Sequence, residues 1–316
     1  MSRRVTSNPC SDLEPPDRAG ARSEMAETIE LRGGSFRGLL LDNEANADRQ
    51  GSGFTPLCHR SRPDHNLFRD DAVGLNFEHV MNGAAADADR SMFTPRRDRC
   101  LLLSHSPGEA SVLHPAADSS WGIESEMRYR LGPDWVDMEF TARLTDESCA
   151  PLGYVAFMWA SYMNRTRGRA IHFYGTCDGE EGWVRFRVQL ADGFETGTVA
   201  HASVDPLPCE EGAQTLNIVE DPRKRFLLPF YYGLTEGGMV YAMMFDQEAP
   251  VRFALWNFIR DERGRPDPHS PAWDWQYVIR APEVGRTCRY RSRLLYRPFV
   301  DREAVRSAYE EWAAGP

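Results

Sequence analysis

Three clusters of polar and aromatic side chains could carry chemistry in this sequence. The first lies in residues 74–83, where Asn76, Glu78 and His79 follow one another closely. Neighbouring side chains on a regular strand point to opposite faces, so Glu78 and His79 are not expected to meet there as an acid–base pair. Asn76 and Glu78 would share a face and could hold a polyol, while in a loop either Glu78 or His79 could reach a cleft. The alternative is a strand-to-loop corner with a solvated glutamate and a hydrogen-bonded histidine.

The second cluster follows an aromatic run. Apolar residues occupy both faces of residues 154–160, Trp159 among them, which indicates a segment buried on both sides. Tyr162, Asn164 and His172 then add hydroxyl, amide and imidazole groups. An aromatic wall edged by such groups suits a sugar, because the C–H face of a sugar stacks on rings while its hydroxyls need donors and acceptors. The alternative is a packed core whose tyrosines and histidine find internal partners.

The third cluster lies in the C-terminal half. Tyr232, Glu236 and Asn257 could supply an acid, a base or an anchor for a ligand. The alternative is again a core, since aromatic residues on strands more often pack than bind. His105 and His114 have neither strand nor helix spacing for joint ligation of a metal, so no metal site is expected.

Composition and missing motifs exclude several classes of function. The net charge of −10 argues against binding to nucleic acid or to an acidic membrane. No phosphate-binding loop, dinucleotide fingerprint or nucleophile elbow is present, so no cofactor is expected. The single lysine, Lys224, lies in a charged run typical of a solvated turn and not of a Schiff-base site. Seven scattered cysteines without a Cys-x-x-Cys pair are typical of a reduced, cytoplasmic protein.

The periodicity of apolar residues predicts a mostly β protein. Residues 1–28 have almost nothing to bury and are expected to form a disordered tail before a single domain at 29–316. Residues 42–71 are expected to form long loops. Alternating or apolar runs predict strands at residues 124–131, 137–144, 183–190, 225–234, 239–246, 250–260, 273–280 and 288–296, with 124–144 forming a hairpin. Only 301–313 reads as a helix, so we expect a large antiparallel β-sandwich with a short C-terminal helix.

Parts of residues 74–200 resemble the galactose-mutarotase-like β-supersandwich proteins. The resemblance rests on GLNFEHVMNG at 74–83, FTPRR at 93–97, SSWGIESEMRYRLGPDWVDMEFTARL at 119–144, and the aromatic block with Asn164 and His172. It implies a sandwich whose concave face handles hexoses, in a group that includes epimerases and domains of glycosidases and polysaccharide lyases. The epimerase pattern of this family uses a histidine pair and a late glutamate as general base. Here His79, His172 and Glu236 are the available residues, although the residues around them do not match the family motif.

The preferred function is that of a carbohydrate-active enzyme, an isomerase or a lyase, that works by proton transfer. His79 or His172 would be the acid or base, with Glu78 or Glu236 as its partner. Arg97 would hold a carboxylate or a developing oxyanion, and Trp159 would stack on the sugar.

Two other functions stay open. One is a non-catalytic sugar-binding sandwich that uses the same aromatic face. The other is a structural or assembly protein whose aromatic strands form the core or a homodimer interface. In the preferred case the partner is a small molecule or an oligosaccharide, with no nucleic acid or membrane, and a homodimer is left open.

Overall fold

Alternating side chains build the centre of the molecule from local sequence. The computed structural model describes residues 27–43, 51–85, 92–187, 190–191, 194–213, 220–257, 259–265 and 267–315. Strands β8 (Ile123–Leu131) and β9 (Trp135–Leu144) bury every second residue. They pair antiparallel, with Glu124 opposite Arg143, so the predicted hairpin is confirmed.

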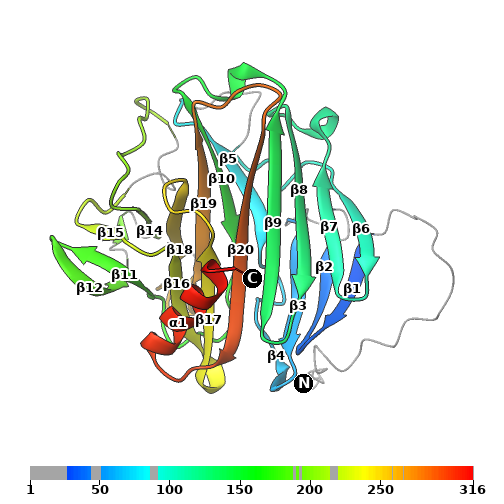
Figure 1. The fold of residues 1–316 in the computed structure, drawn as a ribbon, viewed down its shortest axis with the longest axis vertical. Helices are drawn as coiled ribbons and strands as arrows, with labels where there is room; N and C mark the ends of the chain where they lie inside the picture. Colours follow the sequence, from blue (N-terminus) through cyan, green and yellow to red (C-terminus); the bar gives the residue numbers. More distant parts are fainter. Residues whose placement is uncertain are drawn as a thin grey trace, which may run out of the picture.

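This hairpin belongs to a ten-stranded antiparallel sheet that forms one layer of the molecule (Figure 1). In spatial order, one side of the sheet runs through β12 (Glu180–Phe186), β11 (Ile171–Cys177), β16 (Phe230–Thr235), β17 (Met239–Phe245) and β20 (Thr287–Pro298) to β9. On the other side, β8 is followed by β7 (Glu109–His114) and β6 (Leu101–Ser106), and the short β15 (Lys224–Phe226) pairs with β11.

A six-stranded sheet packs against the ten-stranded one. Its strands, in spatial order, are β13 (Leu190–Ala191), β14 (Phe194–Ala200), β18 (Val251–Asn257), β19 (Ala272–Arg280), β10 (Tyr154–Ala160) and β5 (Asn76–Met81). Every residue of β10 is buried, as its two-sided apolar pattern predicts. The core between the sheets is aromatic, with Trp159 stacked on Trp275 at 5.6 Å and edge-on to Phe140. We call the opposite face of the six-stranded sheet the outer face.

The N-terminal part adds a third, four-stranded sheet. Its strands, in order, are β1 (Thr28–Gly33), β2 (Phe36–Leu41), β3 (Gly53–His59) and β4 (Arg62–Asn66). The prediction of long loops at 42–71 is therefore wrong for β3 and β4. Both strands carry a proline and polar residues of low strand propensity, and they are held in place by neighbours that the local pattern does not reveal.

One α-helix, α1 (Arg302–Ala313), ends the described chain, as predicted. The side chain of Asp301 caps it by accepting a hydrogen bond from the backbone N–H of Ala304 at 2.7 Å. Its buried Tyr309 stacks on Phe230 of β16, so the helix lies on the face of the ten-stranded sheet that points away from the core. The described residues also form three short 3₁₀ segments, η1 (Ala116–Asp118), η2 (Glu147–Cys149) and η3 (Glu236–Gly238).

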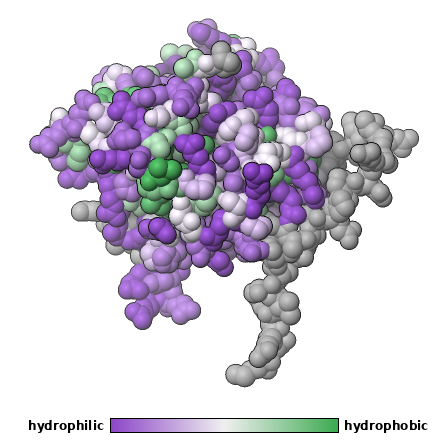
Figure 2. Space-filling view, turned by 60° about the horizontal axis from the view of Figure 1, so that its bottom comes forward, coloured by the Kyte–Doolittle hydropathy of each residue, from purple (hydrophilic) through white to green (hydrophobic). Residues whose placement is uncertain are grey.

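Other expectations concern the tail, the thiols and the surface. The predicted tail falls, up to residue 26, outside the described residues. Cys58 is disulfide-bonded, which corrects the expectation of an entirely reduced chain, whereas Cys100, Cys149, Cys177, Cys209 and Cys288 form no disulfide. No helix within the described ranges is long and apolar enough to cross a membrane. The face shown in Figure 2 is mainly hydrophilic, with a small apolar patch.

Candidate functional site

A β-bulge in strand β5 creates the site. Phe77 lies opposite Trp159 of β10 and His79 lies opposite Met158, so Glu78 is an extra residue without its own partner on β10. Phe77 packs in the core between the sheets, and the bulge turns both Glu78 and His79 to the outer face. The prediction that Glu78 and His79 point to opposite faces is therefore wrong. His79 Nε2 lies 3.4 Å from Glu78 Oε1.

Glu78 is the centre of a buried hydrogen-bond network. Its carboxylate accepts hydrogen bonds from Tyr162 Oη at 2.6 and 2.8 Å, from Asn76 Nδ2 at 2.9 Å and from Arg96 Nη1 at 2.8 Å. Only 3% of the residue is exposed. Burial alone would raise the pKa of Glu78, but the neighbouring imidazole of His79, the charge of Arg96 and the hydrogen bond from Tyr162 outweigh it and lower the pKa to about 2. Glu78 is therefore an anion at neutral pH, and it fixes the groups around it.

His79 is held in one orientation. Its Nδ1 lies 3.1 Å from the carbonyl oxygen of Met92, and because a carbonyl only accepts, Nδ1 carries the proton. The ring stacks on Trp256 of β18 at 5.8 Å and meets Phe93 edge-on at 4.8 Å. Nε2 is buried, makes no hydrogen bond and is turned toward Glu78. A buried, oriented imidazole with one open nitrogen can accept a proton.

Strand β19 supplies a second carboxyl group to the same face. Trp273 and Trp275 point into the core, so the alternation of the strand sends Asp274 and Gln276 to the outer face. Gln276 lies opposite Met158, which itself lies opposite His79, so these side chains form one row across the sheet. This pair of residues was missed in the sequence. The available signal was a charged and an amide residue alternating with tryptophans on a strand.

Asp274 is fully buried, and its environment is the reverse of that of Glu78. Its Oδ1 accepts a hydrogen bond from the backbone N–H of Ser161 at 3.1 Å, while Oδ2 is buried without a hydrogen-bond partner. Burial and the negative charge of Glu78 raise the pKa of Asp274 well above its usual range. This shift favours the neutral carboxylic acid, the form that can donate a proton.

The predicted residues of segment 74–83 come together in the structure, and one residue of the second predicted cluster, Tyr162, joins them. Asn76, Glu78, His79 and Tyr162 meet on the outer face. The guanidinium that binds Glu78 belongs to Arg96 and not to the predicted Arg97, which is exposed and lies over the ring of Phe93 at 5.2 Å.

The other predicted residues lie elsewhere. Trp159 is fully buried in the core, so it has no surface on which a sugar could stack. Trp256, which is partly exposed beside His79, is the outer-face ring. Asn164 donates from Nδ2 to the carbonyl oxygen of Asn66 at 3.1 Å and so links the end of β10 to β4. Asn257 ends β18 in the alternation that faces the core, two residues after Leu255.

His172, Tyr232 and Glu236 belong to the ten-stranded sheet and its turns. His172 on β11 stacks on Tyr232 of β16 at 5.2 Å. Burial and the nearby charge of Arg185 lower the pKa of His172. Glu236, half exposed in η3, pairs with Arg165 at 3.4 Å. The expected pair of histidines with a late glutamate is therefore not assembled from His79, His172 and Glu236.

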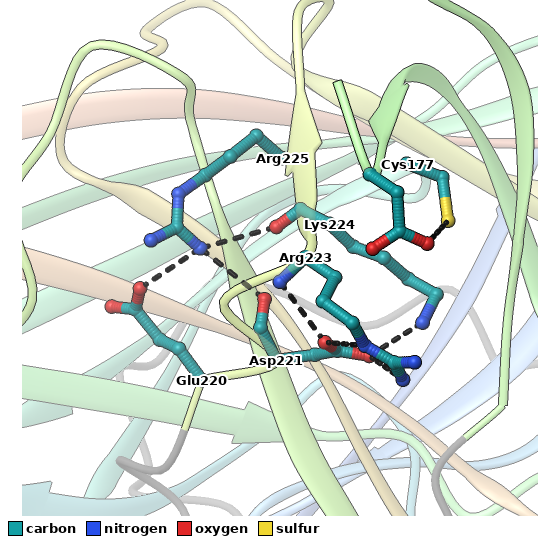
Figure 3. Close-up of polar contacts among 7 residues, drawn as sticks. Cys177, Glu220, Asp221, Arg223, Lys224 and Arg225 are labelled. Atoms are coloured by element: carbon teal, nitrogen blue, oxygen red, sulfur yellow. Dashed lines mark hydrogen bonds and ion pairs between the residues drawn. The ribbon is translucent and has the colours of Figure 1, made fainter. Parts of the chain in front are cut away.

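Lys224, the single lysine, lies away from this site. Lys224 Nζ lies 2.5 Å from Asp221 Oδ2, and Figure 3 shows it among Arg223, Arg225 and Glu220. Lys224 begins β15 and is mostly buried, which corrects the expectation of a solvated turn. Within the described ranges, no group of three or more His, Cys, Asp or Glu side chains is arranged to hold a metal ion.

Comparison with known proteins places the fold. No protein-family model matches the chain, and no curated protein matches it in sequence. A putative aldose 1-epimerase from Escherichia coli K12 is similar in structure, with a TM-score of 0.51 and 10% identity over 86% of this chain and 99% of that one. The Slr1438 protein from Synechocystis sp. PCC 6803 has a TM-score of 0.52 and 9% identity over 91% of this chain and 100% of that one. A galactose mutarotase-like protein from Lactobacillus casei ATCC 334 has a TM-score of 0.50 and 8% identity over 85% of this chain and 100% of that one.

These similarities confirm the distant resemblance to galactose-mutarotase-like proteins that the sequence motifs predict. They also confirm a mostly β, antiparallel sandwich with a short C-terminal helix. At such low identity they show the fold alone, and the activity has to be argued from the site.

Proposed function

We propose that this chain is a carbohydrate-active enzyme that moves protons to and from an aldose on the outer face of the six-stranded sheet. One observation carries the proposal: two buried carboxyl groups lie on that face, and their pKa values are driven in opposite directions. The pKa of Glu78 is lowered to about 2, whereas that of Asp274 is raised well above its usual range. Paired carboxyl groups with opposed pKa values are a feature of acid–base catalysis.

Asp274 is the proton donor of the proposal. It enters the reaction as a neutral carboxylic acid and gives its proton to the ring oxygen of a cyclic aldose as the bond between that oxygen and the anomeric carbon breaks. Its Oδ2 has no competing hydrogen-bond partner, and Ser161 holds Oδ1. A positioned acid of this kind contributes roughly 10²–10⁴-fold to a rate.

His79 is the proposed base. With its proton on Nδ1, it takes the proton of the anomeric hydroxyl on Nε2, and the resulting imidazolium is stabilised by Glu78 at 3.4 Å. Glu78 is already saturated with donors, so its role is to orient His79 and balance its charge. Return of both protons after rotation about the bond between C1 and C2 closes the ring as the other anomer.

The spacing of the strands agrees with a monosaccharide. β5 and β19 are separated by β10 alone, so the two strands lie about 10 Å apart. His79 shares a row with Gln276, and Asp274 lies on the same face one row further along, beside Asn76. Trp256, stacked on His79, offers a ring face for the C–H groups of the sugar. Two similar structures, a putative aldose 1-epimerase and a galactose mutarotase-like protein, support the same substrate class.

The test is the rate of exchange between anomers of a panel of aldoses, measured by NMR saturation transfer. The wild-type chain should accelerate exchange for at least one sugar. Asp274→Asn and His79→Gln should each lower that rate by about 10²–10⁴-fold. His172→Gln is the matched control, since His172 lies on the ten-stranded sheet, and it should leave the rate unchanged.

A parallel incubation with uronate oligosaccharides tests the lyase form of the proposal through the absorbance of an unsaturated product. Unchanged anomer exchange together with no unsaturated product would overturn the proposal.

One observation favours a second candidate, a structural role without catalysis. Glu78, His79 and Asp274 are at most 3% exposed, so a ligand can reach them only when the segments that cover the outer face move. If no sugar in the panel binds in isothermal titration calorimetry, and Asp274→Asn and His79→Gln change only the stability, the buried polar network is part of the core.

A further inference from the structure

Strand β12 is an open edge of the ten-stranded sheet. On one side it pairs with β11 along its whole length, from Ile171 opposite Phe186 to Cys177 opposite Glu180. The other edge of β11 is already occupied by β15 and β16, and Figure 3 shows the ion pairs that hold β15 in place. No described strand pairs with the outer edge of β12, which lies at the margin of the molecule (Figure 1).

The hairpin between β11 and β12 determines which backbone groups are free. Two residues with positive φ, Asp178 and Gly179, join Cys177 to Glu180. In a two-residue hairpin the flanking residues exchange both of their hydrogen bonds, and the pattern then alternates along the strand. The N–H and C=O groups of Glu181, Trp183 and Arg185 therefore point to the open edge.

The charges on this edge are sorted by sign. Glu180 and Glu181 begin the strand, whereas Arg185 lies near its end, and all three are exposed. Charged residues on an edge strand usually discourage pairing with another strand. A second copy aligned in parallel would bring like charges together, but an antiparallel copy centred on Trp183 brings Glu181 of each chain opposite Arg185 of the other. The sequence of β12 is thus complementary to itself in one orientation.

We propose that two copies of this chain pair antiparallel through β12 and form a dimer with a continuous sheet. The two-fold axis passes beside Trp183, so that Glu181 of each copy faces Arg185 of the other. The backbone groups of Glu181, Trp183 and Arg185 then form the hydrogen bonds across the axis, in agreement with the alternation of the hairpin. The same surface serves both copies, so the assembly closes at two.

Trp183 is prepared for such a contact. Its indole Nε1 donates to Glu303 Oε1 of helix α1 at 2.8 Å, and the guanidinium of Arg302 lies over its ring at 5.6 Å. The ring is therefore fixed on the face of the sheet that α1 covers. Two such rings would lie next to each other across the axis and bury apolar surface beside the backbone hydrogen bonds.

Sedimentation equilibrium of the full chain tests the proposal. The wild-type chain should be a dimer. Glu181→Arg places two arginines against each other at both ends of the interface, and Arg185→Glu does the same with two glutamates. Each variant should raise the dissociation constant by about tenfold or more, since attraction changes to repulsion in two cross-strand pairs. The double variant Glu181→Arg/Arg185→Glu exchanges the charges and should restore the dimer.

Glu180→Arg is the matched control. It changes the net charge as Glu181→Arg does, but the backbone of Glu180 bonds to β11 and its side chain lies on the other face of the strand. It should leave the dimer intact. Circular dichroism of each variant reports whether it folds, and amide exchange at Glu181, Trp183 and Arg185 should slow as the wild-type concentration rises. A wild-type monomer at the highest soluble concentration, or a double variant that does not recover, overturns the proposal.

Discussion

Glu78 and His79 are neighbours in the chain and lie on the same face of strand β5, with Nε2 of the histidine 3.4 Å from Oε1 of the glutamate. A regular strand forbids this arrangement, because adjacent side chains alternate. The extra residue of a bulge opposite Met158 and Trp159 permits it. The relationship between these two residues is the reason that the outer face can hold an oriented imidazole beside a carboxylate.

The network around Glu78 should make stability depend on pH in acid. The pKa of Glu78 in the folded chain, about 2, lies below its ordinary value of 4.5. The group therefore contributes stability that is fully present above pH 4.5 and is lost as the pH falls toward 2. Glu78→Gln should lower the unfolding free energy at neutral pH by about 3 kcal/mol, since it leaves Arg96 and His79 without their anion. Urea unfolding should show the gap between variant and wild type closing as the pH falls, and a constant gap would contradict the assignment.

Asp274 should show the opposite sign. Its pKa in the folded chain lies well above the ordinary 3.8, so its stabilising contribution is present below pH 3.8 and is lost as the pH rises toward the folded value. Asp274→Asn keeps the shape without titrating and should raise the unfolding free energy at neutral pH by about 1 kcal/mol or more. The same variant should lower the rate of anomer exchange by about 10²–10⁴-fold. A variant that is less stable than wild type at neutral pH would show that the carboxyl group is ionised there.

Arg96 and Arg97 form a matched pair. Arg96→Ala removes the guanidinium from the buried Glu78 and should cost about 2–4 kcal/mol in urea unfolding. Arg97→Ala changes an exposed side chain over Phe93 and should leave stability within about 0.5 kcal/mol of wild type. If the two variants lost the same amount of stability, the ion pair between Arg96 and Glu78 would not be the contact that stabilises the fold.

Two tryptophans should separate stability from binding. Trp159→Ala opens a cavity between the sheets and should cost about 3–5 kcal/mol of unfolding free energy. Trp256→Ala removes the ring beside His79 and should weaken sugar binding, measured by isothermal titration calorimetry, with a smaller effect on unfolding. The reverse pattern, with affinity lost only in Trp159→Ala, would return the sugar-binding role to the core aromatic run.

The local pattern of apolar residues predicts the central hairpin and the strands of the C-terminal half. Alternation predicts the hairpin at 124–144, and the two-sided apolar run predicts that β10 is buried. These features depend on residues a few positions apart, which is the range in which side-chain period decides structure. Strands β3 and β4 are not predicted by the local pattern. Their prolines and polar residues form strands only because neighbouring strands pair with them.

The site was only partly accessible to the same reasoning. Asn76, Glu78, His79 and Tyr162 were selected for their chemistry and do converge, but Asp274 and Arg96 were not selected. His172 and Glu236 were also selected, but they lie on the ten-stranded sheet and in one of its turns. Residue type indicates what a side chain can do, whereas the pairing of β5, β10 and β19 determines which side chains share a face.

The sequence by itself determined a mostly β sandwich, the central hairpin at 124–144, the strands of the C-terminal half, the closing helix and the residues rich in chemistry. Tertiary structure alone decided that a bulge turns Glu78 and His79 to one face, and that burial and the charge of Glu78 raise the pKa of Asp274 while that of Glu78 is lowered. The physical reason is that strand periodicity is a local property of the chain. Register, burial and the electrostatic field at a carboxyl group depend on segments far apart in the sequence.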